Sequence, residues 1–304
     1  MSAFRGSFVA LITPFASGEV DWQALDNLVN WHIEQGTHGL VPTGTTGEAS
    51  TLSDEEHIDV IKRCVEIANG RVPVIAGTGS NNTPHAIELT EAAQNVGADA
   101  ALTVTPYYNK PSQEGLYFHF KTIHDSTNIP LILYNIPGRS VVDMSNELVA
   151  RLSRLPRMAG IKDASNDLSR PTWMRLHCDP DFALLSGEDP TSAAYLAQGG
   201  HGCISVTANV APALCARMHE AWQREDIKTF ADTRDRLFGL HGALFFESSP
   251  SPTKYALSRM GFCRPDTRPP ILTASKECRA AVDEAVEHTL GGYGEDNVEQ
   301  ARTA

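Results

Sequence analysis

Short apolar runs alternate with amphipathic segments along most of this chain, and this alternation is the strongest constraint on its fold. All of these runs are too short for a core helix, and all but the run over residues 183–187 contain β-branched residues, so each predicts a buried strand. The eight runs cover residues 8–13, 39–43, 72–77, 100–105, 130–135, 158–162, 183–187 and 203–206. Segments with the helical period supply the crossovers that parallel strands require; the clearest cover residues 22–34, 54–68, 83–96 and 113–126.

Eight strand–helix units predict an α/β fold of the (β/α)8, or TIM barrel, type. A doubly wound open sheet is the alternative. Such a sheet usually carries a glycine-rich phosphate-binding turn after its first strand, whereas the first run here continues into Thr13-Pro14-Phe15. We therefore favour the barrel.

After the eighth run the pattern is wholly helical. The expected helices cover residues 212–223, 227–246, 252–260 and 276–290, and Gly291-Gly292 forms a stop signal after the last. The sequence thus predicts a barrel over residues 1–226 and a C-terminal helical annex over residues 227–292. Residues 293–304 are polar and lack an apolar stripe, so we expect a disordered tail there.

Charge and cysteine content exclude several classes of protein. A formal net charge of −12 without any basic stripe argues against nucleic-acid and anionic-membrane partners. The N-terminal apolar run over residues 8–12 is too short for a signal peptide or a membrane span. The six cysteines lack zinc-type spacing, and none of the eleven histidines lies in an HExxH pattern, so we expect a cytoplasmic protein without a metal site.

Lys162 is the candidate nucleophile, because it interrupts the apolar run that begins at Met158. Burial disfavours the ammonium form of a lysine, and the neutral amine can attack a ketone to form a Schiff base. On this stretch alone, a lysine that reaches solvent or pairs with Asp163 is the more common alternative.

The chemistry of such a barrel lies where the strands end, and three of these ends carry suitable residues. The Gly44–Glu48 loop offers backbone N–H groups and the hydroxyls of Thr45 and Thr46 to a substrate carboxylate. Helix capping is its alternative function, but Ser53–Glu56 forms a better capping box for the next helix.

The other two strand ends carry tyrosines and an arginine. Tyr107, Tyr108 and Tyr134 lie at the predicted rim, where a Tyr–Thr–Tyr chain could shuttle protons; packing is the common alternative for each. Arg139 could grip the carboxylate of a second substrate with two hydrogen bonds, or form a surface ion pair.

Together these motifs resemble the signature of the dihydrodipicolinate synthase family. The likeness rests on Gly44–Glu48, Tyr134–Arg139 and Gly160-Ile161-Lys162, and it runs from about Phe4 to Gly261. It implies a class I aldolase-type lyase without a cofactor, which condenses pyruvate with L-aspartate 4-semialdehyde in lysine and diaminopimelate synthesis.

The resemblance also implies roles for single residues. Lys162 forms the Schiff base with pyruvate, and the loop with Thr45 and Thr46 holds the pyruvate carboxylate. Tyr134 relays protons through Thr45, and Tyr108 crosses into a neighbouring subunit to complete the relay. The remaining implied site residues are Arg139, which places the semialdehyde, and Gly187 and Ile204, whose backbone lines the pyruvate pocket.

Family likeness further implies a homotetramer that is a dimer of dimers, and in some members a site for inhibitory lysine. The residues that match this site are Ala49, Ser50, Asp54, His57, Asn81, His85 and Tyr107. Asp54 replaces a usual ring, and His85 replaces a glutamate that meets the ammonium group of lysine, so we expect weak or absent inhibition.

Three alternative functions are less favoured, and of these only the first stays a close alternative. Keto-deoxy-sugar and sialic-acid lyases of the same superfamily share the lysine and the tyrosine but generally lack an arginine at position 139. A non-catalytic sensor of keto acids would lack the lysine or the tyrosines. A sugar-phosphate isomerase would need a cation near the glycines of residues 199–202, and none is present there.

Overall fold

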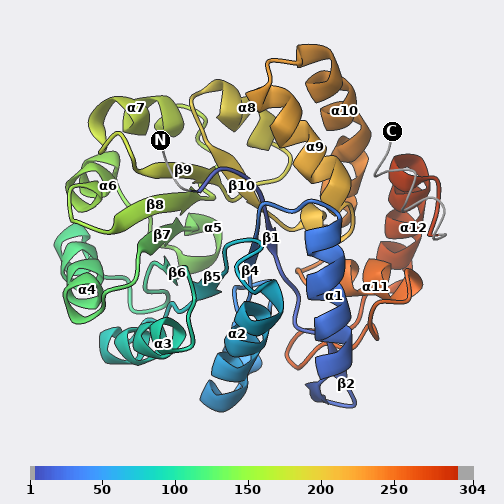
Figure 1. Ribbon diagram of the computed structural model, residues 1–304, viewed down its shortest axis with the longest axis horizontal. Helices are drawn as coiled ribbons and strands as arrows, with labels where there is room; N and C mark the ends of the chain where they lie inside the picture. The colour runs from blue at the N-terminus through green and yellow to red at the C-terminus, as the bar shows by residue number, and fades with distance from the viewer. Residues whose placement is uncertain (1–3, 294–304) are drawn as a thin grey trace. The chain divides into compact units, whose positions relative to one another are not determined.

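The computed structural model describes residues 4–293, and the chain divides into two compact units. Residues 4–6 and 73–204 belong to the first unit, and residues 7–72 and 205–293 belong to the second. Figure 1 shows the succession of strands and helices along the chain.

The first unit is built on parallel strands in the order β10-β9-β8-β7-β6-β5. The strands are β5 (Ile75–Gly77), β6 (Ala100–Val104), β7 (Leu131–Asn135), β8 (Met158–Asp163), β9 (Ala183–Ser186) and β10 (Gly202–Ser205). The helices between them are α3 (Thr83–Asn95), α4 (Gln113–Ser126), α5 (Pro137–Ser140), α6 (Asn146–Ser153), α7 (Arg170–His177) and α8 (Ser192–Ala197). In Figure 1 helices α3, α4, α6 and α7 lie on the outer side of these strands.

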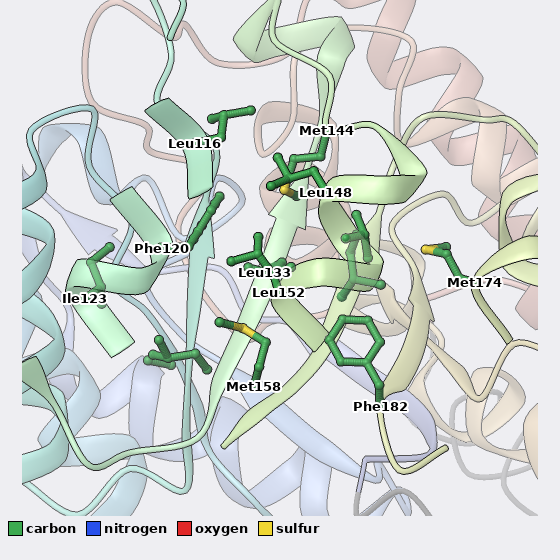
Figure 2. Packing of buried hydrophobic residues seen from close by; sticks show 14 of the residues in the cluster. Leu116, Phe120, Ile123, Leu133, Met144, Leu148, Leu152, Met158, Met174 and Phe182 are labelled. Carbon is green, nitrogen blue, oxygen red and sulfur yellow. The ribbon is translucent and has the colours of Figure 1, made fainter. Parts of the chain in front are cut away.

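A buried apolar cluster joins these helices to their strands (Figure 2). Phe120 of α4, Leu133 of β7, Leu152 of α6 and Met158 of β8 belong to it, as does Phe182 just before β9. Burying a side chain of this size stabilises the fold by about 1.5–3 kcal/mol. This packing of helices against strands therefore fixes the positions of β7, β8 and β9.

The second unit contains the first two barrel strands and all the helices that follow the eighth. Its strands are β1 (Gly6–Ala10), β4 (Gly39–Val41) and the antiparallel hairpin of β2 (Phe15–Ala16) and β3 (Glu19–Val20). Its helices are α1 (Trp22–Glu34), η1 (Ala49–Thr51), α2 (Asp54–Ala68), η2 (Thr207–Asn209), α9 (Pro212–Gln223), α10 (Ile227–Ala243), α11 (Ser251–Arg259) and α12 (Lys276–Leu290). Strand β1 pairs with β4 in parallel, with Phe8 opposite Gly39.

Helix α11 packs against α1 and the residues that follow β1. Leu257 of α11 forms a small apolar cluster with Ile12, which follows β1, and with Leu28 of α1. Trp31 and Phe262 cover this cluster, and their rings lie 4.3 Å apart. Helix α11 therefore shares a core with α1 and with the residues that follow β1.

The order of eight parallel strands with intervening helices and a helical C-terminal segment confirms the predicted fold class. Helix α2 has the predicted boundaries at both ends, and it begins with the capping box of Ser53 and Glu56. The predicted stop signal after the last helix is also present: Gly291 ends α12 in the left-handed conformation, with a φ of 79°.

Several details differ from the expectations. The hairpin of β2 and β3 was not predicted, because two-residue strands leave no periodic pattern. Helix α10 ends at Ala243 rather than at residue 246. The division into a barrel over residues 1–226 and an annex over 227–292 stays a prediction. Of the predicted tail, residues 294–304 lie outside the described residues, while the Tyr293 hydroxyl donates to Asp283 at 2.8 Å.

Two further properties concern membranes and disulfides. Within residues 4–293, no helix combines the length and the apolar character needed to cross a bilayer. All six cysteines lie in this described part, and none takes part in a disulfide.

Buried histidines predict how stability depends on pH. Burial lowers the pKa of His32 in α1 and of His219 in α9 from the ordinary 6.5 to about 3. Below about pH 6.5 the unfolded chain takes up protons that the folded chain excludes. The free energy of unfolding therefore has its full value above about pH 6.5. It decreases as the pH falls from about 6.5 to about 3, by up to about 1.4 kcal/mol per pH unit for each histidine.

We expect the urea midpoint to fall between about pH 7 and about pH 5, and to fall less in His32→Leu. His288→Leu, at an exposed position of α12, is the matched control. An equal fall in His32→Leu and the parent would contradict this explanation.

Candidate functional site

Lys162 and Tyr134 face each other across neighbouring strands. The register of β7 and β8 pairs Tyr134 with Lys162 and Asn135 with Asp163. Lys162 Nζ lies 4.2 Å from the centroid of the Tyr134 ring. Both residues are buried, with Lys162 7% and Tyr134 5% exposed. The structure thus brings together the predicted nucleophile and the predicted proton relay residue.

Asp163 is the partner of Arg170 and not of Lys162. Side chains alternate between the two faces of a strand, so Asp163 points away from its neighbour Lys162. Its Oδ2 accepts a hydrogen bond from Arg170 Nε at 2.9 Å, and its Oδ1 accepts one from the N–H of Ser165 at 3.1 Å. The alternative interpretations of Lys162, a solvent-facing side chain or a pair with Asp163, are therefore wrong.

A buried polar network continues behind both strands. Asn135 donates from Nδ2 to Asp143 at 2.7 Å and accepts from the N–H of Met144 at 3.0 Å. Arg170 donates to the Met144 carbonyl oxygen at 2.9 Å and lies 3.7 Å from Asp143. These contacts fix the residues directly after Tyr134 and Lys162. No local sequence pattern reveals this brace, because its members lie in β7, in β8, in α7 and in the loop before α6.

Gly187 lies beside the Lys162 side chain at the end of β9. Its N–H donates to the Asp163 carbonyl oxygen at 2.7 Å. A Cβ at this position would lie 2.7 Å from Ala164 Cβ and 3.1 Å from Lys162 Cε. Continuation of the β9–β10 register, in which Cys203 faces Ser186, places Ile204 level with Gly187. Gly187 therefore directly follows β9, the neighbour of β8, whereas Ile204 lies in β10, one strand further along the sheet.

Glu188 is a titratable group that the sequence analysis did not select. Burial, followed by the nearby Asp189, raises the pKa of its carboxyl group, while Lys162 and Arg139 act in the opposite direction. Its position directly after Gly187 at a strand end was the signal that could have revealed it. Arg139 itself is exposed in the short helix α5.

Tyr107 and Tyr108 lie in the loop after β6. Tyr108 is 91% exposed and has a φ of 71°, in the region that non-glycine residues rarely adopt. The Tyr107 carbonyl oxygen accepts from Asn81 Nδ2 at 3.2 Å and from the N–H of Asn109 at 2.9 Å. The loop backbone is thus anchored, while the Tyr108 side chain is almost fully exposed.

The Gly44–Glu48 loop follows β4 in the second unit. A Cβ on Gly47 would lie 2.9 Å from the Thr43 N atom, so only glycine fits this tight turn. Thr13 Oγ1 donates to the Gly47 carbonyl oxygen at 2.7 Å. Thr45 is exposed and Thr46 is buried. The next helix is capped by Ser53, as expected, so capping does not occupy this loop.

The residues that match the lysine site are divided between the two units. Ala49 and Ser50 lie in η1, and His57 is buried in α2. Asn81 and Tyr107 both lie in the first unit, where Asn81 Nδ2 donates to the Tyr107 carbonyl oxygen. Binding of lysine to these residues stays a prediction.

The profile of the Dihydrodipicolinate synthetase family matches residues 3–289. The chain belongs to this family. The match spans both units and most of the annex, so the motifs that suggested the resemblance lie within one continuous homologous region.

Curated and solved members of the dihydrodipicolinate synthetase family agree with this assignment. A protein from Rhodospirillum centenum named 4-hydroxy-tetrahydrodipicolinate synthase is 59% identical over 94% of this chain and 98% of its own length. The chloride-inhibited dihydrodipicolinate synthase from Acinetobacter baumannii, complexed with pyruvate, is 46% identical, with a TM-score of 0.91 over 94% of this chain and 98% of its own. The enzyme from Cyanidioschyzon merolae with lysine bound is 33% identical, with a TM-score of 0.91 over 95% and 99%.

The close approach of Gly187 to Lys162 generates a test. In Gly187→Ala the added methyl group would meet Ala164 Cβ and Lys162 Cε, so the lysine side chain must move. We expect borohydride trapping of pyruvate on Lys162 to slow by on the order of 100-fold, because small displacements of a reacting group are costly. Gly239→Ala, in an open position of α10, is the control and should trap pyruvate at the parental rate. A folded Gly187→Ala variant that traps pyruvate at the parental rate would contradict the prediction.

Proposed function

We propose that this chain condenses pyruvate with L-aspartate 4-semialdehyde to give 4-hydroxy-tetrahydrodipicolinate. Relatives that are more than half identical over most of the chain carry the name of this synthase. The observation that carries the proposal is Lys162: it is buried against the Tyr134 ring, while the adjacent carboxylate is paired with Arg170. The chain is accordingly a class I aldolase-type lyase.

The reaction starts when the neutral amine of Lys162 attacks the ketone carbon of pyruvate. Loss of water gives a protonated imine, and loss of a proton from the pyruvate methyl group gives an enamine. The enamine carbon then adds to the aldehyde of the semialdehyde. Finally, the amino group of the second substrate attacks the imine carbon, so the product cyclises and the Lys162 amine leaves.

Tyr134 serves as the proton relay at the Schiff base. Its ring lies against Lys162 Nζ, which keeps a phenol group beside the reacting nitrogen. Thr45 and Tyr108 complete the relay in this proposal, with Tyr108 supplied by a neighbouring subunit. The exposed, strained conformation of Tyr108 supports that assignment, because its own unit gives it little to pack against.

Substrate binding is divided among the remaining predicted residues. Thr46, with the backbone N–H groups of its loop, takes the pyruvate carboxylate. Gly187 and Ile204 shape the pocket for the small keto acid. Arg139, exposed beyond the end of β7, takes the carboxylate of the semialdehyde. A keto-deoxy-sugar or sialic-acid substrate is the alternative, and the assay below distinguishes it.

The assembly and location follow the same reasoning. We propose a homotetramer, because a tyrosine that serves a neighbouring site needs a neighbour. We also propose a cytoplasmic location, supported by the absence of disulfides among the cysteines, all of which lie within residues 4–293. The expectation that no cofactor is needed stays a prediction, since the protonated imine can itself act as the electron sink.

Turnover with both substrates tests the activity, with dihydrodipicolinate reductase and NADPH oxidation as the coupled readout. We expect Lys162→Ala to lower turnover on the order of 1,000-fold or more, because the nucleophile is lost. Lys228→Ala removes a lysine whose side chain is 88% exposed and should leave turnover unchanged. No turnover by the parent, combined with borohydride trapping of pyruvate, would move the assignment to another keto-acid aldolase.

Mixing two inactive variants tests the shared site. Lys162→Ala and Tyr108→Phe each lack one essential group, so each alone should have low activity. After the two proteins are unfolded and refolded together, a mixed dimer contains one site with both Lys162 and Tyr108. We expect turnover to recover to a sizeable fraction of the parental value. Mixtures that stay as inactive as their components would refute the crossing tyrosine.

A further inference from the structure

Glu48 and Lys254 form a buried ion pair outside the residues assigned to catalysis. Lys254 Nζ lies 2.5 Å from Glu48 Oε1, and the two side chains are 0% and 1% exposed. The Lys254 ammonium group donates its hydrogen bond to the Asp266 carbonyl oxygen at 2.9 Å and lies 4.0 Å from the centre of the Phe15 ring. Glu48 is the last residue of the Gly44–Glu48 loop, while Lys254 lies in annex helix α11.

Arg268 also binds Glu48 and contacts residues that follow the loop. Its backbone N–H donates to Glu48 Oε2 at 2.9 Å. Its guanidinium group donates to the Thr51 carbonyl oxygen at 2.8 Å, to the carboxylate of Glu56 at 2.6 and 2.7 Å, and to the Gly18 carbonyl oxygen at 2.7 Å. The segment between α11 and α12 therefore contacts Glu48 at the end of the loop and also Thr51 and Glu56, which follow it.

This arrangement fixes the backbone where it would otherwise be strained. Glu48 has a φ of 54°, an unfavourable value for a residue with a side chain, and its side chain makes no capping hydrogen bond to η1. A buried ion pair gains little net stability, since desolvation opposes the attraction between its charges. The pair does, however, hold the Glu48 carboxylate in one position, and this restricts the backbone conformation of the loop that contains Thr45 and Thr46.

We propose that Lys254 is a positioning residue for pyruvate binding, acting through Glu48 on the Gly44–Glu48 loop. The proposal rests on the proposed function, in which Thr46 and the loop N–H groups receive the pyruvate carboxylate. It gives the helical annex a part in the reaction, because the annex supplies the cation that fixes the loop.

Lys254→Met and Glu48→Gln test the proposal. Met keeps a long unbranched side chain without the charge, and Gln keeps an acceptor for the Arg268 N–H. In both variants we expect KM for pyruvate to rise by about 10-fold or more, because the loop loses its fixed position. KM for the semialdehyde should change less than 2-fold or so, as that substrate meets Arg139 instead. Arg259→Met, which breaks the more exposed ion pair of α11 with Asp283, is the matched control.

The double variant separates positioning from stability. Single substitutions leave one buried charge unpaired and should lower the thermal midpoint, whereas Glu48→Gln with Lys254→Met leaves none. We expect the double variant to recover much of the midpoint while KM for pyruvate stays raised. Recovery of KM together with the midpoint, or an unchanged KM in the folded single variants, would overturn the proposal.

Borohydride trapping keeps this test independent of the second substrate. The pyruvate concentration that gives half-maximal trapping on Lys162 should rise in Lys254→Met as KM does, and should stay at the parental value in Arg259→Met. If the parent traps pyruvate but does not turn over the semialdehyde, the proposed function fails, and the trapping series still decides the role of Lys254.

Discussion

The alternation of side chains at the ends of β7 and β8 is the constraint on which the proposed chemistry depends. It places Tyr134 and Lys162 on one face and Asn135 and Asp163 on the other. Arg170 then takes up the charge of Asp163 at 2.9 Å. A lysine that shared that carboxylate would be held as an ammonium ion, which cannot attack a ketone. The pairing of Arg170 behind the strand thus keeps the front of the strand available for a nucleophile.

Each unit contains one buried ion pair next to residues of the proposed site. Arg170 and Asp163 brace the strand that carries Lys162, while Lys254 and Glu48 fasten the loop that carries Thr46. Breaking such a pair by removing one partner costs on the order of 3–5 kcal/mol, although the intact pair adds little net stability. In our proposal both pairs act mainly by holding the residues of the site in one geometry. Substrate groups can then be bound without first ordering the residues that bind them.

The sequence predicted helices and strands well where a segment had a periodic distribution of apolar residues or a helix-capping motif. The bounds of α1, α2, α4, α9 and α12 agree with the expected segments, and all eight barrel strands lie at the apolar runs. Elements without a periodic signal were missed or misplaced, as with the two-residue strands β2 and β3. The role of Glu48 was missed for another reason: its partner Arg268 is 220 residues away, and no local rule relates positions so far apart.

The sequence by itself determined the fold class, the family and the identity of the candidate nucleophile. Hydrophobic periodicity, helix-capping residues and short motifs are local properties of the sequence. They can be recognised without knowing which segments contact each other in the fold. Only the tertiary structure decided that Asp163 belongs to Arg170, that Glu48 belongs to Lys254, and that Gly187 must lack a side chain beside Lys162. Charge pairing and close packing act over a few ångströms in space whatever the separation along the chain. The partners were therefore settled by folding and not by sequence order.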